Sequence, residues 1–133
     1  MTDRYEIEID ANKQRGVVRF LGDVEGRDMV DAYSRLFSSG DWRLTYDSVW
    51  DFTGIESLDM SLEDVDSMMD TSRALTAAGQ SGRVVGVVAQ EDHEIMARLI
   101  RARLTRLGRE AELFESMEEA EAWLDAPATA SRT

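Results

Sequence analysis

Six consecutive residues near the middle of the chain, 84–89, read VVGVVA and contain no polar side chain. A strand with one face in water alternates apolar and polar residues, whereas a strand inside a parallel sheet is covered on both faces. The segment therefore predicts a central parallel strand. Parallel neighbours need crossover connections, usually helices, so the segment also favours an α/β fold. Gly86 within it predicts the close approach of a helix or a loop.

The spacing of apolar residues predicts the elements around this strand. Alternation or short apolar runs predict strands, and recurrence at three and four residues predicts helices. The predicted strands are residues 5–10, 16–21, 49–52, 84–89 and 111–114, and the predicted helices lie around residues 29–37, 62–75, 92–107 and 116–124. The order β-β-α-β-α-β-α-β-α implies an α/β sandwich with a mostly parallel five-stranded sheet, an antiparallel N-terminal hairpin and about four helices.

Turn residues set the expected boundaries. Residues 11–15 suit a hairpin turn, residues 22–26 suit a loop, and Thr53-Gly54 suits the exit from the third strand. We expect one domain over residues 1–126 and a flexible C-terminal tail over residues 127–133.

Cap residues predict where two of the helices begin. Asp92 is a suitable N-cap for the third helix, and Ser116 with Glu119 makes a capping box that opens the fourth. The third helix is expected to bury one apolar stripe: Ile95, Met96, Leu99, Ile100, Leu104 and Leu107.

Composition narrows the classes of function. The 133 residues include no cysteine, which excludes a disulfide framework and a thiolate metal site. The net charge of −12 makes nucleic acid and anionic membrane surfaces unsuitable partners. No apolar run approaches the roughly 20 residues of a membrane span, and the N-terminal residues are too polar for a signal peptide. We therefore expect a cytoplasmic protein.

The predicted order also concentrates charge. The carboxyl ends of the last three strands, and the starts of the helices that follow them, should share one edge of the sheet, where ligands bind in open α/β folds. The three turns at this carboxyl edge hold acids and no Lys or Arg: Glu56, Asp59, Glu63, Asp64, Glu91, Asp92, Glu94, Glu115, Glu118 and Glu119. The opposite edge receives Arg43, Arg73, Arg83, Arg106 and Arg109.

Two interpretations of this charge pattern are open. Acids near helix N-termini and bases near C-termini complement the helix dipole, by roughly 0.3–1 kcal/mol each. An acidic face would also steer a basic protein surface toward the edge. Under either interpretation the acids disfavour a phosphate ligand, which a helix N-terminus alone would attract.

The sequence offers little material for catalysis. His93 is the only histidine, so no Ser-His-Asp triad or multi-histidine metal site exists without it, and its acidic neighbours predict a solvated position. Asp59 and Asp92 could approach each other at the carboxyl edge, but no sequence feature indicates a pocket around them. Neither GxGxxG nor GxxxxGK[ST] occurs. We expect no enzyme activity, no cofactor and no metal site.

The methionines and one serine have two possible roles each. Met68, Met69 and Met96 fit core filler, or alternatively the lining, with Leu99, of a site for a small apolar, lipid-like ligand between the second and third helices. Ser61 fits an N-cap of the second helix, worth about 1 kcal/mol. Its hydroxyl also lies at a strand-to-helix corner, where a phosphate would add about −1.5 to −2 charges.

Residues 51–55, DFTGI, followed by Asp59-Met60-Ser61, resemble the motif of STAS domains, the SpoIIAA-like anti-anti-sigma factor family. There an apolar strand leads into D-[LF]-[ST]-G-[VI], three residues, and D-S-S-G at the start of a helix. Residues 114–124, F-x-S-x-E-E-A-x-x-W-L, resemble the last helix of that family. The order of elements matches over nearly the whole chain.

The resemblance implies a SpoIIAA-like sandwich and a regulatory, protein-binding role. In switchable members the second serine of D-S-S-G accepts a phosphate from a partner kinase, and Ser61 is the matching position. Met60 stands in place of the first serine and Leu62 in place of the glycine, so the chain is similar to the divergent, stand-alone STAS/SEC14-type proteins.

These observations lead to a hypothesis for the interaction surface. We expect an unknown protein partner, of the kinase or sigma-regulator type that the resemblance suggests, and a homodimer is a further possibility. The surface is predicted to comprise Thr53, Gly54, Glu56, Ser57, Asp59, Ser61, Asp64, Asp92 and His93, with Ser61 as a possible phosphoacceptor.

Overall fold

A computed structural model of the chain describes residues 4–126, so the predicted tail over residues 127–133 lies outside the described residues. The elements follow the predicted order: β1 (Tyr5–Asp10), β2 (Arg15–Glu25), α1 (Gly26–Ser38), β3 (Asp47–Asp59), α2 (Leu62–Ala77), β4 (Val84–Val87), α3 (Glu91–Arg106), β5 (Ala111–Phe114) and α4 (Met117–Asp125).

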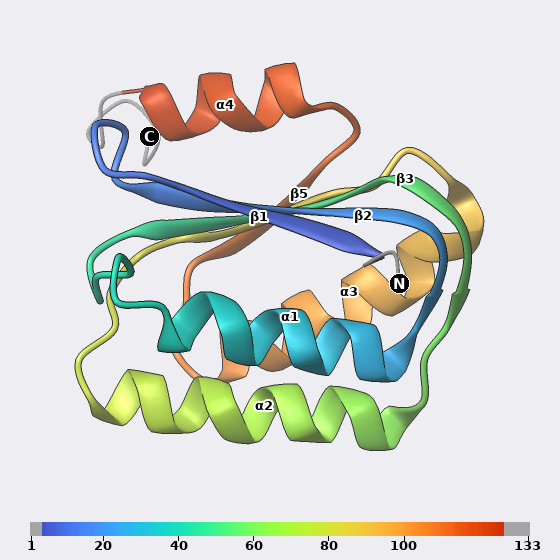
Figure 1. Cartoon of the computed structure of the whole chain (residues 1–133), viewed down its shortest axis with the longest axis horizontal. Helices are drawn as coiled ribbons and strands as arrows, with labels where there is room; N and C mark the ends of the chain where they lie inside the picture. Colours follow the sequence, from blue (N-terminus) through green and yellow to red (C-terminus); the bar gives the residue numbers. More distant parts are fainter. Residues whose placement is uncertain (1–3, 127–133) are drawn as a thin grey trace.

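The five strands form one sheet in the spatial order β1-β2-β3-β4-β5. β1 and β2 pair antiparallel, and every other neighbouring pair is parallel. Helices α1, α2 and α3 lie under one face of the sheet, and α4 lies on the other (Figure 1). The predicted α/β sandwich with an N-terminal hairpin is confirmed.

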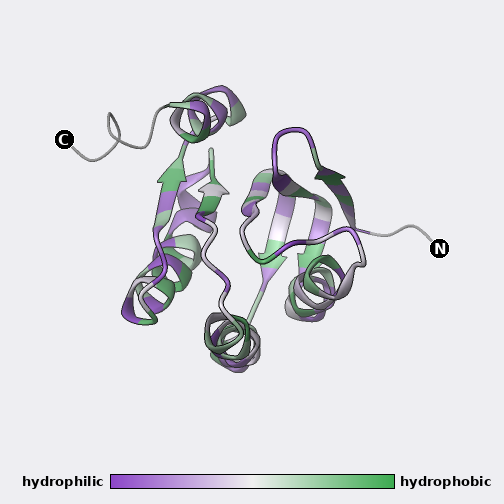
Figure 2. Cartoon of the chain, turned by 90° about the vertical axis from the view of Figure 1, so that its left-hand side faces the viewer, coloured by the Kyte–Doolittle hydropathy of each residue, from purple (hydrophilic) through white to green (hydrophobic). Residues whose placement is uncertain are grey.

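The core has two parts because helices cover both faces of the sheet. The larger part lies between the sheet and the helices α1, α2 and α3, and it is rich in aromatic rings, among them Phe20, Trp50 and Phe52. The smaller part lies between the sheet and α4 and includes Val85 and Val87 of β4, an interior strand next to the β5 margin. α4 stands over the β4–β5 side of its face, and no helix of the described chain covers the β1 side (Figure 2).

β4 is the two-sided strand that its sequence predicts, although it ends at Val87 rather than Ala89. All four of its residues are buried. A Cβ on Gly86 would lie 2.7 Å from Leu113 Cδ2. The close neighbour of Gly86 is therefore a side chain of the adjacent strand β5, and the prediction of a helix or a loop there was wrong.

β2 and β3 are much longer than predicted. They pair in parallel from Arg15–Asp47 to Glu25–Asp59, with register shifts between Arg19 and Leu21 and between Gly22 and Asp23. Past the point where β3 stops pairing with β4, the paired strands β2 and β3 curve together toward the starts of α1 and α2 (Figure 1). The loop predicted for residues 22–26 and the exit predicted at Thr53-Gly54 were therefore wrong.

The two glycines that suggested turns lie instead within the long pair of strands β2 and β3, which we call the ribbon. Gly22 has φ +72°, a backbone conformation that L side chains rarely adopt. A Cβ on Gly54 would lie 2.7 Å from the carbonyl oxygen of Phe20. In β3 the irregular pairing also breaks the alternation, since the buried Ile55 lies three residues after the buried Phe52 and not two or four.

α3 begins two residues earlier than its predicted N-cap implies, and it faces the core differently from the prediction. Its N-cap is Gln90, and Asp92 lies in the first turn. Its fully buried residues are His93, Ala97 and Leu104, whereas Ile95 is 77% exposed. The stripe was placed by hydrophobicity, but the helix turns a histidine and an alanine toward the sheet in place of Ile95.

Candidate functional site at the carboxyl edge

The carboxyl ends of β2, β3, β4 and β5 deliver the starts of all four helices to one edge of the sheet, because these strands are parallel. The prediction included three of these helix starts. It missed the start of α1, with Gly26 and Asp28, because residues 22–26 were interpreted as a loop. The repeated spacing of Glu25 to Asp28 and Ser61 to Asp64 is the signal that could have indicated it.

Ser61 is the N-cap of α2, as predicted. Its Oγ accepts from the backbone N of Asp64 at 3.2 Å. The Asp64 carboxylate closes the other half of the box, with its Oδ2 2.9 Å from both the backbone N and the Oγ of Ser61. The hydroxyl is exposed and is hydrogen-bonded only within its own turn among the described residues. Asp64, predicted as part of a binding surface, therefore has a structural role.

The starts of α1 and α2 are packed together through Asp64. A Cβ on Gly26 would lie 1.8 Å from Asp64 Oδ2, so only glycine fits at that position. Asp28 closes the start of α1 in a similar way, its Oδ2 accepting from the backbone N of Glu25 at 2.8 Å. Carboxylates thus already occupy the two helix starts where a phosphate would bind.

The segment predicted as a binding loop is the curved end of β3. Thr53 donates from its backbone N and from Oγ1 to Asp51 Oδ1, at 2.9 and 2.6 Å. Ser57 Oγ donates to Asp23 Oδ1 at 2.7 Å. The exposed residues of this segment, Thr53, Gly54, Glu56, Ser57 and Asp59, therefore lie on a hydrogen-bonded ribbon.

His93 does not belong to the predicted surface. Only 6% of it is exposed, and it lines a small apolar pocket together with Met60, Met96, Met29 and Phe52. Its Nδ1 has no hydrogen-bond partner. The prediction of a solvated histidine was wrong, because α3 turns this position under the curved ribbon. The neighbouring Asp92 is exposed.

The side-chain carboxylates of several acids at the carboxyl edge make no hydrogen bond or ion pair within residues 4–126. They are Glu56, Asp59, Glu63, Glu91, Asp92, Glu115 and Glu118. Glu94 differs, because it pairs with Arg98 at 2.7 Å. No group of three or more His, Asp or Glu side chains in that part of the chain is arranged to hold a metal ion.

Two bases of the opposite edge, Arg83 and Arg109, are used inside the fold, whereas Arg43, Arg73 and Arg106 are exposed. Arg83 pairs with Asp47 at 2.9 Å and donates to the carbonyl of Leu124. Arg109 is 7% exposed and donates to the carbonyl of Gly82 at 2.5 Å. Burial lowers the pKa of the Arg109 guanidinium from its ordinary value. Arg83 and Arg109 hold the chain together and are not available to a partner.

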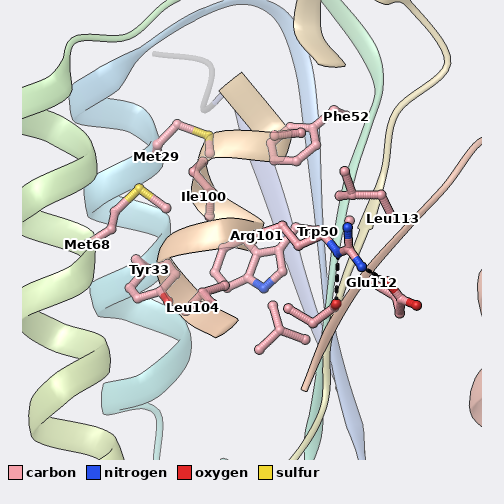
Figure 3. Close-up of a pocket in the computed structure, with 14 residues that line it drawn as sticks. Met29, Tyr33, Trp50, Phe52, Met68, Ile100, Arg101, Leu104, Glu112 and Leu113 are labelled. Carbon is pink, nitrogen blue, oxygen red and sulfur yellow. Dashed lines mark hydrogen bonds and ion pairs between the residues drawn. The ribbon is translucent and has the colours of Figure 1, made fainter. Parts of the chain in front are cut away.

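A pocket lies between α3 and the sheet, where part of the alternative apolar site was predicted (Figure 3). Its volume is about 30 Å³, and Met68 lines it together with rings such as Trp50 and Phe52. Met69 and Leu99 do not line it. Arg101 lies beside the pocket at β5, donating from Nε to the carbonyl of Ala111 and pairing with Glu112 at 2.6 Å.

No family model matches the chain, and no curated protein matches it. Among solved structures, the anti-sigma factor antagonist SpoIIAA in its unphosphorylated form aligns with 89% of this chain and 94% of its own, with a TM-score of 0.52 and 16% identity. The chain has the SpoIIAA fold. The resemblance inferred from residues 51–61 is thereby confirmed for the architecture, which at this identity is all that the likeness shows. No helix between residues 4 and 126 has the length and apolar character needed to cross a membrane.

Proposed function

We propose that this chain is a non-catalytic regulatory module that binds a protein partner through the carboxyl edge of its sheet. The observation that carries the proposal is the contrast in charge use. Acids such as Glu56, Asp59 and Asp92 make no contact with a base of the described chain, whereas Arg83 and Arg109 are bound inside the fold. Unpaired carboxylates on a rigid ribbon and on helix starts attract a basic protein surface.

Ser61 is the proposed switch of this surface. It is exposed, at the corner between β3 and α2, and its hydroxyl shares a hydrogen bond with the Asp64 carboxylate. A phosphate there would add about −1.5 to −2 charges beside Asp64 and would displace the cap. We infer that a partner kinase modifies Ser61 and that the modification weakens binding. SpoIIAA, an anti-sigma factor antagonist with the same fold, supports a partner of the sigma-regulator type in the cytoplasm.

Affinity capture from the native host tests the proposed surface. The variant E56Q/D59N/D92N removes three unpaired acids of the carboxyl edge, and E6Q/E8Q/D41N removes three exposed acids elsewhere. The expected result is that a partner bound by the unchanged chain is lost with the first variant and kept with the second. Equal capture by both variants would exclude the carboxyl edge as the binding surface.

An apolar ligand stays the second candidate, carried by the pocket next to Met68. The pocket volume of about 30 Å³ suits one very small group, and an engineered cavity of about 150 Å³ is needed to bind benzene. A lipid-like ligand would therefore require α3 to move away from the sheet. Native mass spectrometry of protein purified from its host tests this candidate: a co-purified apolar molecule supports it, and apoprotein alone excludes it.

A further inference from the structure

Two large aliphatic side chains are exposed near the starts of neighbouring helices at the carboxyl edge, one in the first turn of α2 and one at the beginning of the second turn of α3. Leu62, the first residue of α2, is 59% exposed, and Ile95 of α3 is 77% exposed. Within residues 4–126 the other two exposed large hydrophobic residues are Leu21 and Leu44, and neither lies on a helix. Paired exposed aliphatic groups at one place mark an interaction surface more often than scattered single ones do.

A seam runs between α2 and α3, with Leu62 near its start on α2 and Ile95 on the outer, solvent-facing side of α3. Leu62 and Asp66 are four residues apart and share one side of α2, and Leu99 and Arg103 share one side of α3 in the same way. Arg103 Nη1 donates to Asp66 Oδ1 at 2.9 Å, so these two sides face each other. Ile95 lies one turn before Leu99.

The walls of the seam are adaptable. Met60, just before the cap of α2, packs in one cluster with Met96 of α3 and is itself partly exposed. Methionine side chains are flexible and fit irregular apolar partners. We call this surface, formed by Leu62, Asp66, Ile95, Leu99 and Arg103 with the two methionines, the α2–α3 seam.

Carboxylates border the seam where it meets the carboxyl edge. Asp59 and Glu63 lie close to Leu62 in sequence, and Glu91 and Asp92 lie in the first turn of α3, just before Ile95. All four are exposed and have no ion pair in the described chain. The two arginines on this part of α3 already have partners, since Arg98 pairs with Glu94 and Arg103 with Asp66.

We infer that the α2–α3 seam binds an amphipathic helix of the partner protein. The aliphatic stripe of that helix lies over Leu62 and Ile95, and its Lys or Arg side chains meet Asp59, Glu63, Glu91 and Asp92. Helices dock into apolar grooves between helices in this manner. The inference rests on the proposed function, because it specifies the kind of partner for the same edge. An anionic membrane or a nucleic acid would be repelled by the same carboxylates.

A labelled peptide is the probe for this inference. The peptide has about 18 residues, five helical turns, of Leu, Ala and Lys with all Leu on one stripe. Its first control replaces every Lys by Glu, and its second control keeps the composition but scatters the Leu residues. Fluorescence anisotropy with the full chain, at low and physiological ionic strength, is expected to show binding of the first peptide only, weakened by salt.

Matched variants locate the site. L62S/I95S removes both aliphatic groups without touching the core and is expected to weaken binding by about tenfold or more. L21S/L44S removes the other two exposed groups and is expected to leave binding unchanged. D59N/E63Q/E91Q/D92N should weaken binding and reduce its dependence on salt. Circular dichroism confirms that each variant is folded.

Equal affinity for L62S/I95S and the unchanged chain, or equal binding of the Glu peptide, would overturn the inference. A change in the sedimentation of the chain alone in L62S/I95S would show instead that a second copy covers the seam, and would overturn it too. If the peptide fails while E56Q/D59N/D92N still loses its captured partner, only the helical nature of the partner is wrong. If both fail, the proposed function is wrong as well.

Discussion

The two edges of the sheet differ in how several of their charged side chains are used. At the carboxyl edge the acids are exposed and several have no partner, whereas at the opposite edge Arg15, Arg83 and Arg109 are wholly or partly buried and bound to groups of the fold. Both patterns complement the helix dipoles equally well. The comparison shows that charge becomes available for recognition only where the fold does not already use it.

The largest effect is expected from Arg109→Ala at the opposite edge. The change removes a buried charged donor, leaves the Gly82 carbonyl without it, and opens a cavity. We expect a loss of about 3 kcal/mol in the free energy of unfolding, measured with urea. The exposed Arg106→Ala should change it by less than about 0.5 kcal/mol. Equal small effects would remove the distinction between the two edges.

Gly26→Ala tests whether the carboxyl edge also contains a rigid contact. The new Cβ would overlap the Asp64 carboxylate, which the box with Ser61 holds in place. We expect a loss of roughly 1–3 kcal/mol in unfolding free energy. Asp64→Ala in the same chain should recover part of that loss, because it removes the overlapping group. A fully additive double variant would show that the two residues do not interact.

Two variants of Ser61 separate its effect on stability from its effect on partner binding. Ser61→Ala should lower the unfolding free energy by about 1 kcal/mol, because the cap is lost. Ser61→Asp keeps an N-cap acceptor but sets a second carboxylate beside that of Asp64, so we expect a similar loss of about 1 kcal/mol; its added charge should weaken partner capture, whereas Ser61→Ala should leave capture unchanged. Capture that follows stability in both variants, rather than charge, would leave Ser61 with the role of a cap only.

The smallest effect concerns Asp125, an exposed residue hydrogen-bonded to Arg15 at 2.6 Å. That hydrogen bond, and then the charge of Arg15, hold the pKa of Asp125 below its ordinary value. A lowered folded-state pKa means stabilisation that is present above the unfolded-state pKa and is lost as the pH falls through the folded-state value.

Asp125→Asn should therefore lower the urea midpoint slightly at neutral pH, and the difference should disappear in acid. Glu8→Gln, which removes an exposed acid of β1 away from any helix end, is the control and should leave the urea midpoint at neutral pH unchanged. A difference for Asp125→Asn that persisted in strong acid would contradict the assignment of the Arg15 contact.

The order and type of the elements could be predicted because periodicity and caps act locally. Residues 84–87 have no polar face, and Ser61 precedes a regular helix, so neither depends on distant contacts. The long ends of β2 and β3 could not be predicted, since Gly22 and Gly54 have the same local appearance in a turn and in an irregular ribbon. His93 was misplaced because its burial depends on Met60 and Phe52 from distant parts of the chain.

Arg101 has a consequence for assembly. By donating to the Ala111 carbonyl and pairing with Glu112, it obstructs β5, the strand at one margin of the sheet. β1 forms the other margin, with β2 on its inner side and no described strand beyond it. Each copy therefore offers a single margin for strand addition. Two copies joined through β1 would use both available margins, so strand pairing ends at a closed pair and cannot propagate into a fibre.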